Sequence, residues 1–194
     1  MRSSPKAKCP KRISIVGATG SGKSYLARSL AARLSLPLYQ LDHLRWDASG
    51  REIPEDQFIE RVGKLASKDQ WIIDGHYRAV REIVWTRAEI VAWLNYPLPL
   101  IAFRLLRRFL GKGHRHEVPL ETSGEGVRKT GSSYSPAQIS WKDRLARLAR
   151  TIRERGEYRR LLQAPAYAKV EIVELESPKV TSEWLRKFDG SGFC

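Results

Sequence analysis

Eight residues near the start of the chain have the types and the spacing needed to hold a polyphosphate. The pattern G-x-x-x-x-G-K-[ST] is met at every position by Gly17, Ala18, Thr19, Gly20, Ser21, Gly22, Lys23 and Ser24. Its glycines permit a tight loop whose backbone N–H groups converge on an anion. Lys23 is placed to bridge the outer phosphates, and the Ser24 hydroxyl is placed to bind Mg²⁺. The motif therefore predicts a nucleotide site that uses ATP and Mg²⁺.

The flanks of this loop predict the local structure that such a motif requires. Residues 12–16 form a short β-branched run, which indicates a buried strand. Residues 25–34 predict a helix whose positive N-terminal end faces the same phosphates, with Tyr25 beside the nucleotide. The alternative is a Gly- and Ser-rich turn before an unrelated helix, which requires the motif and both flanks to agree by accident. We therefore expect residues 17–25 to bind the cofactor.

The whole chain has the size and composition of one globular domain. Its 194 residues, 42% of them hydrophobic, suffice for a buried core. No apolar run approaches the roughly 20 residues of a membrane span, and basic residues 1–11 lack the apolar stretch of a secretory signal, so we expect a flexible tail there and no membrane partner. Cys9 and Cys194 lack metal-type spacing, which favours a cytoplasmic protein with reduced thiols.

The chain is strongly basic, with 35 Lys and Arg against 21 Asp and Glu and a formal net charge of +14. The excess is concentrated in residues 104–160, which hold 15 basic and six acidic residues. Such a balance suits a kinase that holds several phosphates, and it equally suits a protein that binds nucleic acid. A nucleic-acid-associated ATPase is therefore kept as the alternative to a small-molecule kinase.

Strand and helix patterns alternate along the rest of the chain. Short apolar runs predict strands at 38–41, 71–73, 90–94 and 170–175, the last near a sheet edge. Helical spacing predicts helices at 54–66, 79–85, 97–110 and 180–188, and Leu106 is among the residues expected to face the core. A further long helix is expected after residue 135, kinked near Gly156. Five strands separated by helices predict an α/β fold with a parallel sheet covered on both faces.

One long segment has no periodicity. Residues 111–135 are dominated by Gly, Ser and charged residues, which predicts a mobile, lid-like insertion within a single domain of residues 1–194. His114 and His116 lie in this segment, but two histidines without a third ligand are weak evidence for a metal site. We therefore expect no metal there.

The ends of the predicted strands carry polar residues. In parallel sheets, ligands bind beyond the carboxyl ends of the strands. At those ends the sequence places Gly17, Asp42, Asp74 and Asn95. Because two of the four are carboxylates, we expect the loop and both acids to belong to one site.

The segment Ile72-Ile73-Asp74-Gly75-His76-Tyr77-Arg78 resembles the D-G-[FY]-P-R segment of adenylate kinases and other nucleoside monophosphate kinases. Taken with residues 17–24 and with Leu41-Asp42-His43-Leu44-Arg45-Trp46, it resembles the bacterial adenylate-kinase-like proteins called topology modulation proteins. The resemblance spans most of the chain. It implies a P-loop NTPase fold with a five-stranded parallel sheet, helices on both faces and a mobile lid.

The resemblance also implies roles for individual residues. Asp74 would help to hold hydrated Mg²⁺ together with Ser24, and Arg78 would meet an acceptor phosphate. Asp42 would meet an acceptor hydroxyl and orient or deprotonate it, with Arg45 and Tyr77 nearby in the substrate site. The catalytic residues would be Lys23, Asp42, Arg104 and Arg108. The alternatives are ordinary turn residues for the two aspartates and solvated side chains for the arginines.

The chain also departs from those kinases. Tyr77 stands where they have proline, and no segment matches the one that encloses AMP in adenylate kinases. Residues 111–135 contain no cysteine set for a zinc lid, and an N-K-x-D guanine signature is absent from the sequence. We therefore predict an ATP- and Mg²⁺-dependent phosphotransferase for a small hydroxyl- or phosphate-bearing acceptor. The alternative is a nucleic-acid-associated ATPase that influences DNA topology; the oligomeric state is left open.

Overall fold

A computed structural model describes residues 9–47, 49–109, 153 and 156–189. The lid-like insertion expected at 111–135, and most of the expected tail, lie outside the described residues. Within them, five strands form one sheet in the order β2-β3-β1-β4-β5, and every pairing is parallel. The strands are β1 (Arg12–Gly17), β2 (Leu38–Gln40), β3 (Trp71–Asp74), β4 (Ile90–Leu94) and β5 (Glu171–Leu175). The predicted five-stranded parallel sheet is therefore confirmed.

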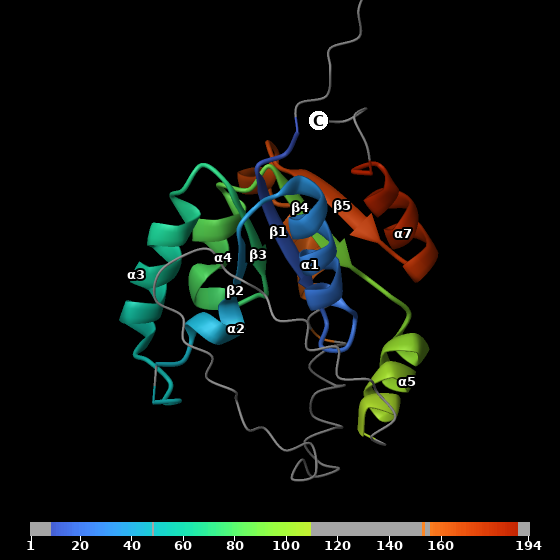
Figure 1. Cartoon of the computed structure of the whole chain (residues 1–194), viewed down its shortest axis with the longest axis horizontal. Helices are drawn as coiled ribbons and strands as arrows, with labels where there is room; N and C mark the ends of the chain where they lie inside the picture. Colours follow the sequence, from blue (N-terminus) through green and yellow to red (C-terminus); the bar gives the residue numbers. More distant parts are fainter. Residues whose placement is uncertain (1–8, 48, 110–152, 154–155, 190–194) are drawn as a thin grey trace, which may run out of the picture.

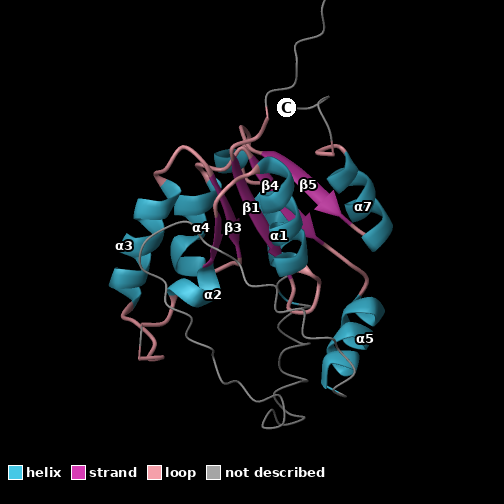
Figure 2. Ribbon diagram, viewed as in Figure 1, coloured by secondary structure: helices cyan, strands magenta, loops and turns pink. Residues whose placement is uncertain are grey.

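Helices cover both faces of this sheet (Figure 1 and Figure 2). They are α1 (Lys23–Leu34), α2 (Leu41–Leu44), α3 (Glu55–Ala66), α4 (Arg78–Trp85), α5 (Leu98–Phe109) and α7 (Pro178–Arg186). Residues 156–162 are also helical, and a 3₁₀ turn, η2, spans Pro165–Tyr167. None of the helices among these residues is long and apolar enough to cross a membrane.

Alternation along the strands divides the core into two clusters. On one face, Ile13 and Ile15 pack with buried residues of α1, α5 and α7. On the other face, Ile73 and Val91 pack with α3, α4 and the helix at 156–162. Both faces of the central strands are therefore buried, as their continuous apolar runs predict.

Two helix starts follow from local chemistry. In α3, Glu55 and Asp56 occupy the first turn directly after Pro54, and acidic side chains favour the positive end of a helix. In α7, the Ser177 side chain accepts a hydrogen bond from the Val180 N–H at 3.2 Å, which caps the helix.

Several expectations are wrong in detail. The second strand ends at Gln40, and Leu41 is 2% exposed, so its burial starts the short helix α2 and puts Asp42 in a helical turn rather than at a strand end. Helix α1 begins at Lys23, two residues earlier than expected. Leu106 is 53% exposed, because α5 turns its neighbours toward the core and carries Leu106 away from it. Cys9 is disulfide-bonded rather than a reduced thiol.

Candidate active site

The glycine-rich loop connects β1 to α1 through strained backbone. Gly17, Gly20 and Gly22 all have positive φ angles, of 146°, 85° and 101°. A Cβ on Gly17 would lie 2.8 Å from the Leu94 carbonyl oxygen, so only glycine fits between the two strands. Gly22 caps α1 without a side-chain hydrogen bond, and the first turn of α1 contains no acidic residue. The N–H groups at this helix end are therefore suited to an anionic ligand.

Lys23 and its neighbours lie at the start of α1. The Lys23 Nζ donates to the Ala18 carbonyl at 3.0 Å, so the ammonium group arches back over the loop. Ser24 is half-buried, and Tyr25 is 69% exposed at the surface of the same turn. The loop thus brings together the residues that the sequence assigned to the nucleotide.

Helix α5 packs onto the loop from the side. The Arg104 Nη1 donates to the Ser21 carbonyl at 2.7 Å, and the guanidinium lies 5.0 Å from the centre of the Tyr96 ring. A Cβ on Gly20 would lie 2.9 Å from the Leu105 side chain, so this glycine is needed for the close approach of α5. Arg104 is therefore placed at the loop, while the Arg108 side chain lies outside the described residues.

Asp74 lies at the carboxyl end of β3, next to the base of the loop. It is 5% exposed, and in the parallel register it stands opposite Ile15 of β1. Its Oδ2 accepts a hydrogen bond from the Gln40 Nε2 at 3.2 Å, whereas its buried Oδ1 has no hydrogen-bond partner among the described residues. An orphaned carboxylate oxygen is costly unless water or a cation satisfies it. A carboxylate oxygen is the type of ligand that Mg²⁺ prefers.

A second group of side chains lies beyond β2 and β3. The Tyr77 hydroxyl donates to Asp42 Oδ1 at 2.9 Å and joins α2 to the start of α4. Burial raises the pKa of Tyr77 above its ordinary value, and the charge of Asp42 raises it further. Arg78 opens α4 and is exposed.

Arg45, which the sequence placed in the substrate site, is already engaged. Its Nε bonds Glu52 Oε1 at 2.6 Å, and its guanidinium lies 5.1 Å from the centre of the Phe58 ring. The charge of Arg45 is therefore balanced within the protein.

His76 is a buried titratable residue to which the sequence assigned no role. It follows Gly75, whose φ of 121° turns the chain out of β3. The imidazole packs against Trp85 and Tyr158, and its buried Nε2 has no hydrogen-bond partner among the described residues. Burial, and then the charge of Arg81, lower the pKa of His76 to about 4, so the ring is neutral at pH 7.

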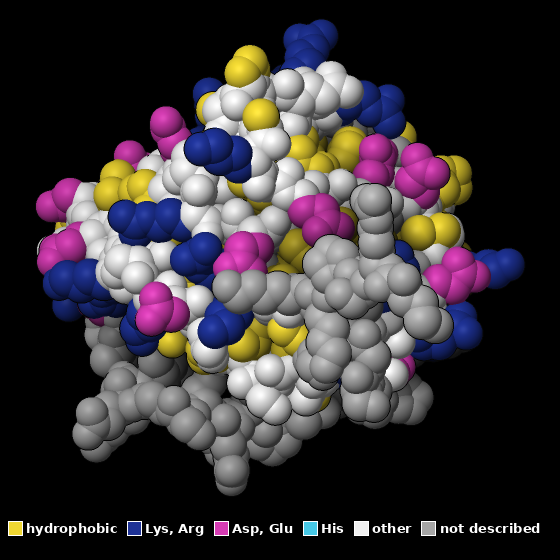
Figure 3. Space-filling model, turned by 90° about the horizontal axis from the view of Figure 1, so that it is seen from above, with side chains coloured by type: hydrophobic (Ala, Val, Ile, Leu, Met, Phe, Trp, Pro, Cys, Tyr) yellow, Lys and Arg dark blue, Asp and Glu magenta, His cyan; other side chains and the backbone are white. Residues whose placement is uncertain are grey.

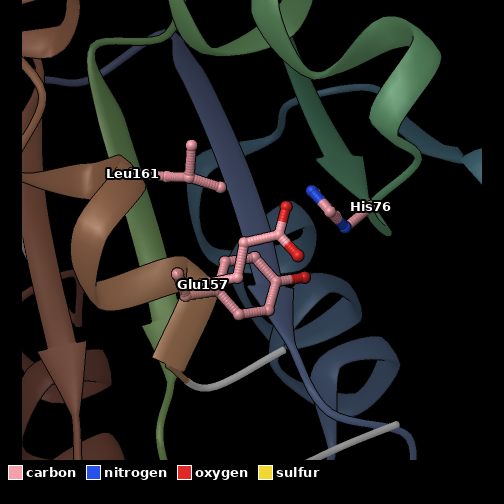
Figure 4. Close-up of a pocket in the computed structure, with 4 residues that line it drawn as sticks. His76, Glu157 and Leu161 are labelled. Carbon is pink, nitrogen blue, oxygen red and sulfur yellow. The ribbon is translucent and has the colours of Figure 1, made fainter. Parts of the chain in front are cut away.

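His76 lines a small pocket under the helix at 156–162. The other lining residues are Glu157, Tyr158 and Leu161. Figure 4 shows the Glu157 carboxylate between the helix and His76. Arg81 donates to Glu157 at 3.1 Å, so an ion pair connects α4 to this helix.

Comparison with known proteins identifies the fold. No family model matches the sequence, and no curated protein matches it. The chain is similar to the solved structure of shikimate kinase from Acinetobacter baumannii in complex with shikimate, with 21% identity, 91% of this chain and 89% of that chain covered, and a TM-score of 0.50. It is similar to a gluconokinase from Sinorhizobium meliloti 1021, with 16% identity, 93% and 90% covered, and a TM-score of 0.50.

A shikimate kinase from Bacteroides thetaiotaomicron also has a TM-score of 0.50, with 14% identity and coverage of 93% of this chain and 97% of that chain. These likenesses show the fold, which is the P-loop kinase fold that the sequence predicts. The closer resemblance to topology modulation proteins has no support in these matches and stays a prediction.

Proposed function

We propose that the protein is an ATP- and Mg²⁺-dependent phosphotransferase that transfers the γ-phosphoryl group to a hydroxyl of a small acceptor. The observation that carries the proposal is the orphaned Oδ1 of Asp74, one strand away from a glycine loop that leads into a helix end without a side-chain cap. The two features together suit a metal–polyphosphate complex better than either does alone.

The cofactor would be held mainly by backbone N–H groups and by two positively charged side chains. The N–H groups of residues 17–24 would receive the phosphates, with Lys23 and Arg104 adding positive charge at the loop. Ser24 and Asp74 would hold Mg²⁺, partly through water. The described residues contain no group of three or more His, Cys, Asp and Glu side chains, so this ion would take its other ligands from phosphate and solvent. When bound, it would neutralise phosphate charge.

Asp42 and Arg78 would serve the acceptor. In the transfer, the acceptor oxygen forms a bond to Pγ while the bond from Pγ to the bridging oxygen of ADP breaks, and ADP leaves with that electron pair. The acceptor hydroxyl loses its proton, which the Asp42 carboxylate is suited to receive. The exposed Arg78 guanidinium would bind an oxygen-bearing group of the acceptor.

The charges favour a hydroxyl acceptor over a phosphorylated one. A phosphomonoester would bring almost two negative charges close to Asp42. Arg45 does not offset them, because Glu52 already pairs with it. A neutral acceptor, or one with a single negative group at Arg78, avoids this repulsion. The similar fold that holds shikimate also supports a small molecule as acceptor.

Among the described residues that it shows, the face at the amino ends of the strands gives no continuous basic surface (Figure 3). Figure 3 shows the molecule from the amino ends of the strands, opposite the glycine loop. On that face Lys and Arg are interspersed with Asp and Glu rather than gathered in one patch. A polymer backbone is bound best by a continuous basic surface.

An acceptor screen tests the proposal. Purified full-length protein with MgATP would be mixed with separate pools of polyols, sugars and hydroxy acids, of nucleosides, of nucleoside monophosphates and of short oligonucleotides, and ADP release would be measured. We expect a hydroxyl pool to stimulate release, and Lys23→Ala to reduce it a hundredfold or more. Lys64→Ala, which removes an exposed lysine of α3, is the matched control. Stimulation by oligonucleotides alone would contradict the proposal.

A further inference from the structure

We infer that Tyr77 is a positioning residue, whose phenol holds the Asp42 carboxylate in the orientation that receives the acceptor hydroxyl. This inference rests on the proposed function and deepens it at the acceptor side of the site. The geometry assigns Tyr77 to Asp42 rather than to the acceptor, which is where the sequence placed it.

The hydrogen bond between the two side chains selects one orientation of the carboxylate. Tyr77 donates to Oδ1 of Asp42 at 2.9 Å, and no described residue donates to Oδ2. Asp42 is exposed and lies on a helix of four residues. With Oδ1 occupied, Oδ2 is the oxygen left for the acceptor.

The phenol itself is anchored to the hydrophobic core. The Tyr77 ring meets the Phe58 ring edge-on, with 5.1 Å between their centres, and Phe58 is completely buried in α3. The Arg45 guanidinium lies over the Phe58 ring and is held by Glu52. A chain of contacts thus runs from the core to the exposed carboxylate.

The direction of the hydrogen bond is fixed by chemistry. Burial and the nearby Asp42 charge raise the pKa of Tyr77, so its hydroxyl keeps its proton throughout the neutral range. Tyr77 is therefore the donor, and Asp42 remains an acceptor at the other oxygen. A phenol that keeps its proton does not compete with Asp42 for the proton of the acceptor hydroxyl.

The kinetic test uses Tyr77→Phe, which keeps the ring and its packing on Phe58 but removes the donor. The matched control is Tyr39→Phe, which removes a different tyrosine hydrogen bond, from Lys68 at 3.1 Å. Both variants would be assayed for ADP release with MgATP and a mixture of glycerol, D-ribose, D-glucose and D-gluconate. We expect Tyr77→Phe to lower kcat about tenfold without changing the KM for ATP, because a misplaced reacting group slows the chemical step. Tyr39→Phe should match the wild type.

A spectroscopic test detects the contact between Tyr77 and Asp42 without requiring turnover. In protein labelled with ¹³C at the tyrosine Cζ, the resonance that is absent from Tyr77→Phe belongs to Tyr77. Asp42→Asn should shift that resonance at pH 7, because the charged carboxylate that accepts the phenol hydrogen bond is replaced by a neutral amide. An unchanged resonance would show that the two side chains do not meet in solution.

Other outcomes overturn the inference in distinguishable ways. An unchanged kcat in Tyr77→Phe would contradict a positioning role. A lower ATP affinity together with a lower unfolding temperature in Tyr77→Phe would assign Tyr77 to packing alone. No acceptor-dependent ADP release from wild-type protein, while calorimetry shows MgATP binding, would contradict the proposed function and remove the reaction on which the inference rests.

Discussion

The proposed nucleotide side and the proposed acceptor side of this site are built in different ways. On the proposed nucleotide side, the shape is made by backbone: three glycines with positive φ angles, a helix end without a side-chain cap, and carbonyl groups that accept hydrogen bonds from Lys23 and Arg104. On the acceptor side, side chains from separate elements make the shape, with Tyr77 reaching Asp42 across 35 positions of the chain.

This difference indicates which parts of the site tolerate substitution. A polyphosphate is the same in every ATP, so a rigid backbone cradle suits it. An acceptor is recognised by a few polar side chains, and these can be exchanged without rebuilding the fold. Substitutions in the loop should therefore act on folding and on all nucleotide binding. Substitutions at Asp42 or Tyr77 should act on turnover with particular acceptors.

The largest effect is expected for Gly17→Ala. The new Cβ would meet the Leu94 carbonyl at 2.8 Å in a backbone conformation that alanine rarely adopts, which should cost about 2 kcal/mol and displace the loop. Thermal unfolding should shift down, and calorimetry should find no MgATP binding. Gly63→Ala is the control, because nothing lies within 4 Å of its Cβ position inside α3, and it should stabilise the protein by up to ~1 kcal/mol. Equal behaviour of the two variants would refute a backbone-built loop.

A smaller effect, confined to the metal, is expected for Asp74→Asn. The amide keeps the size of the side chain but removes the charge beside the proposed Mg²⁺ position, so the Mg²⁺ concentration needed for half-maximal turnover should rise about tenfold. Affinity for ATP without metal should stay unchanged in calorimetry. Asp69→Asn, at an exposed position before β3, should leave the Mg²⁺ dependence as it is. An unaltered Mg²⁺ dependence in Asp74→Asn would remove Asp74 from the metal site.

The smallest effect at neutral pH is expected for His76→Gln. The folded-state pKa of His76 is about 4 against an ordinary 6.5, so the folded protein resists a proton that the unfolded chain accepts. His76 therefore leaves stability unchanged above pH 6.5 and lowers it as the pH falls to 4, by up to about 3 kcal/mol. Urea unfolding from pH 7 to 4 should show a flatter decline in His76→Gln, while His43→Gln, at an exposed position, should follow the wild type. If the stability of the wild type, His76→Gln and His43→Gln declined in parallel as the pH falls, the burial of a neutral ring would be contradicted.

What the sequence predicted well was local. The glycine loop is a contiguous motif between a strand and a helix, and Asp74 ends an apolar run, so both could be placed by counting along the chain. The bond of Tyr77 to Asp42 depends on how α2 and α4 pack, which no spacing rule encodes. The ion pair of Arg45 with Glu52 forms within one loop, where an isolated bridge between Trp46 and Glu52 brings the two side chains together. His76 was missed because a single histidine beside a recognised aspartate carries no pattern of its own.

The position of Asp42 shows most clearly where prediction from local sequence fails. Its run of apolar residues predicts a strand through Leu41, but burial of Leu41 under Gly75 starts a helix instead. The side chain therefore reaches the site from a helical turn, where its orientation depends on Tyr77. Tertiary packing overrides local pattern at this position.

The central claim is that this site transfers the γ-phosphoryl group to a hydroxyl rather than to water. The most direct measurement is ³¹P NMR of MgATP incubated with full-length protein and the pool of polyols, sugars and hydroxy acids. We expect a new phosphomonoester resonance that grows in step with ADP, with little inorganic phosphate, and that is lost in Lys23→Ala. Release of ADP accompanied only by inorganic phosphate, at the same rate with and without the pool, would contradict the central claim.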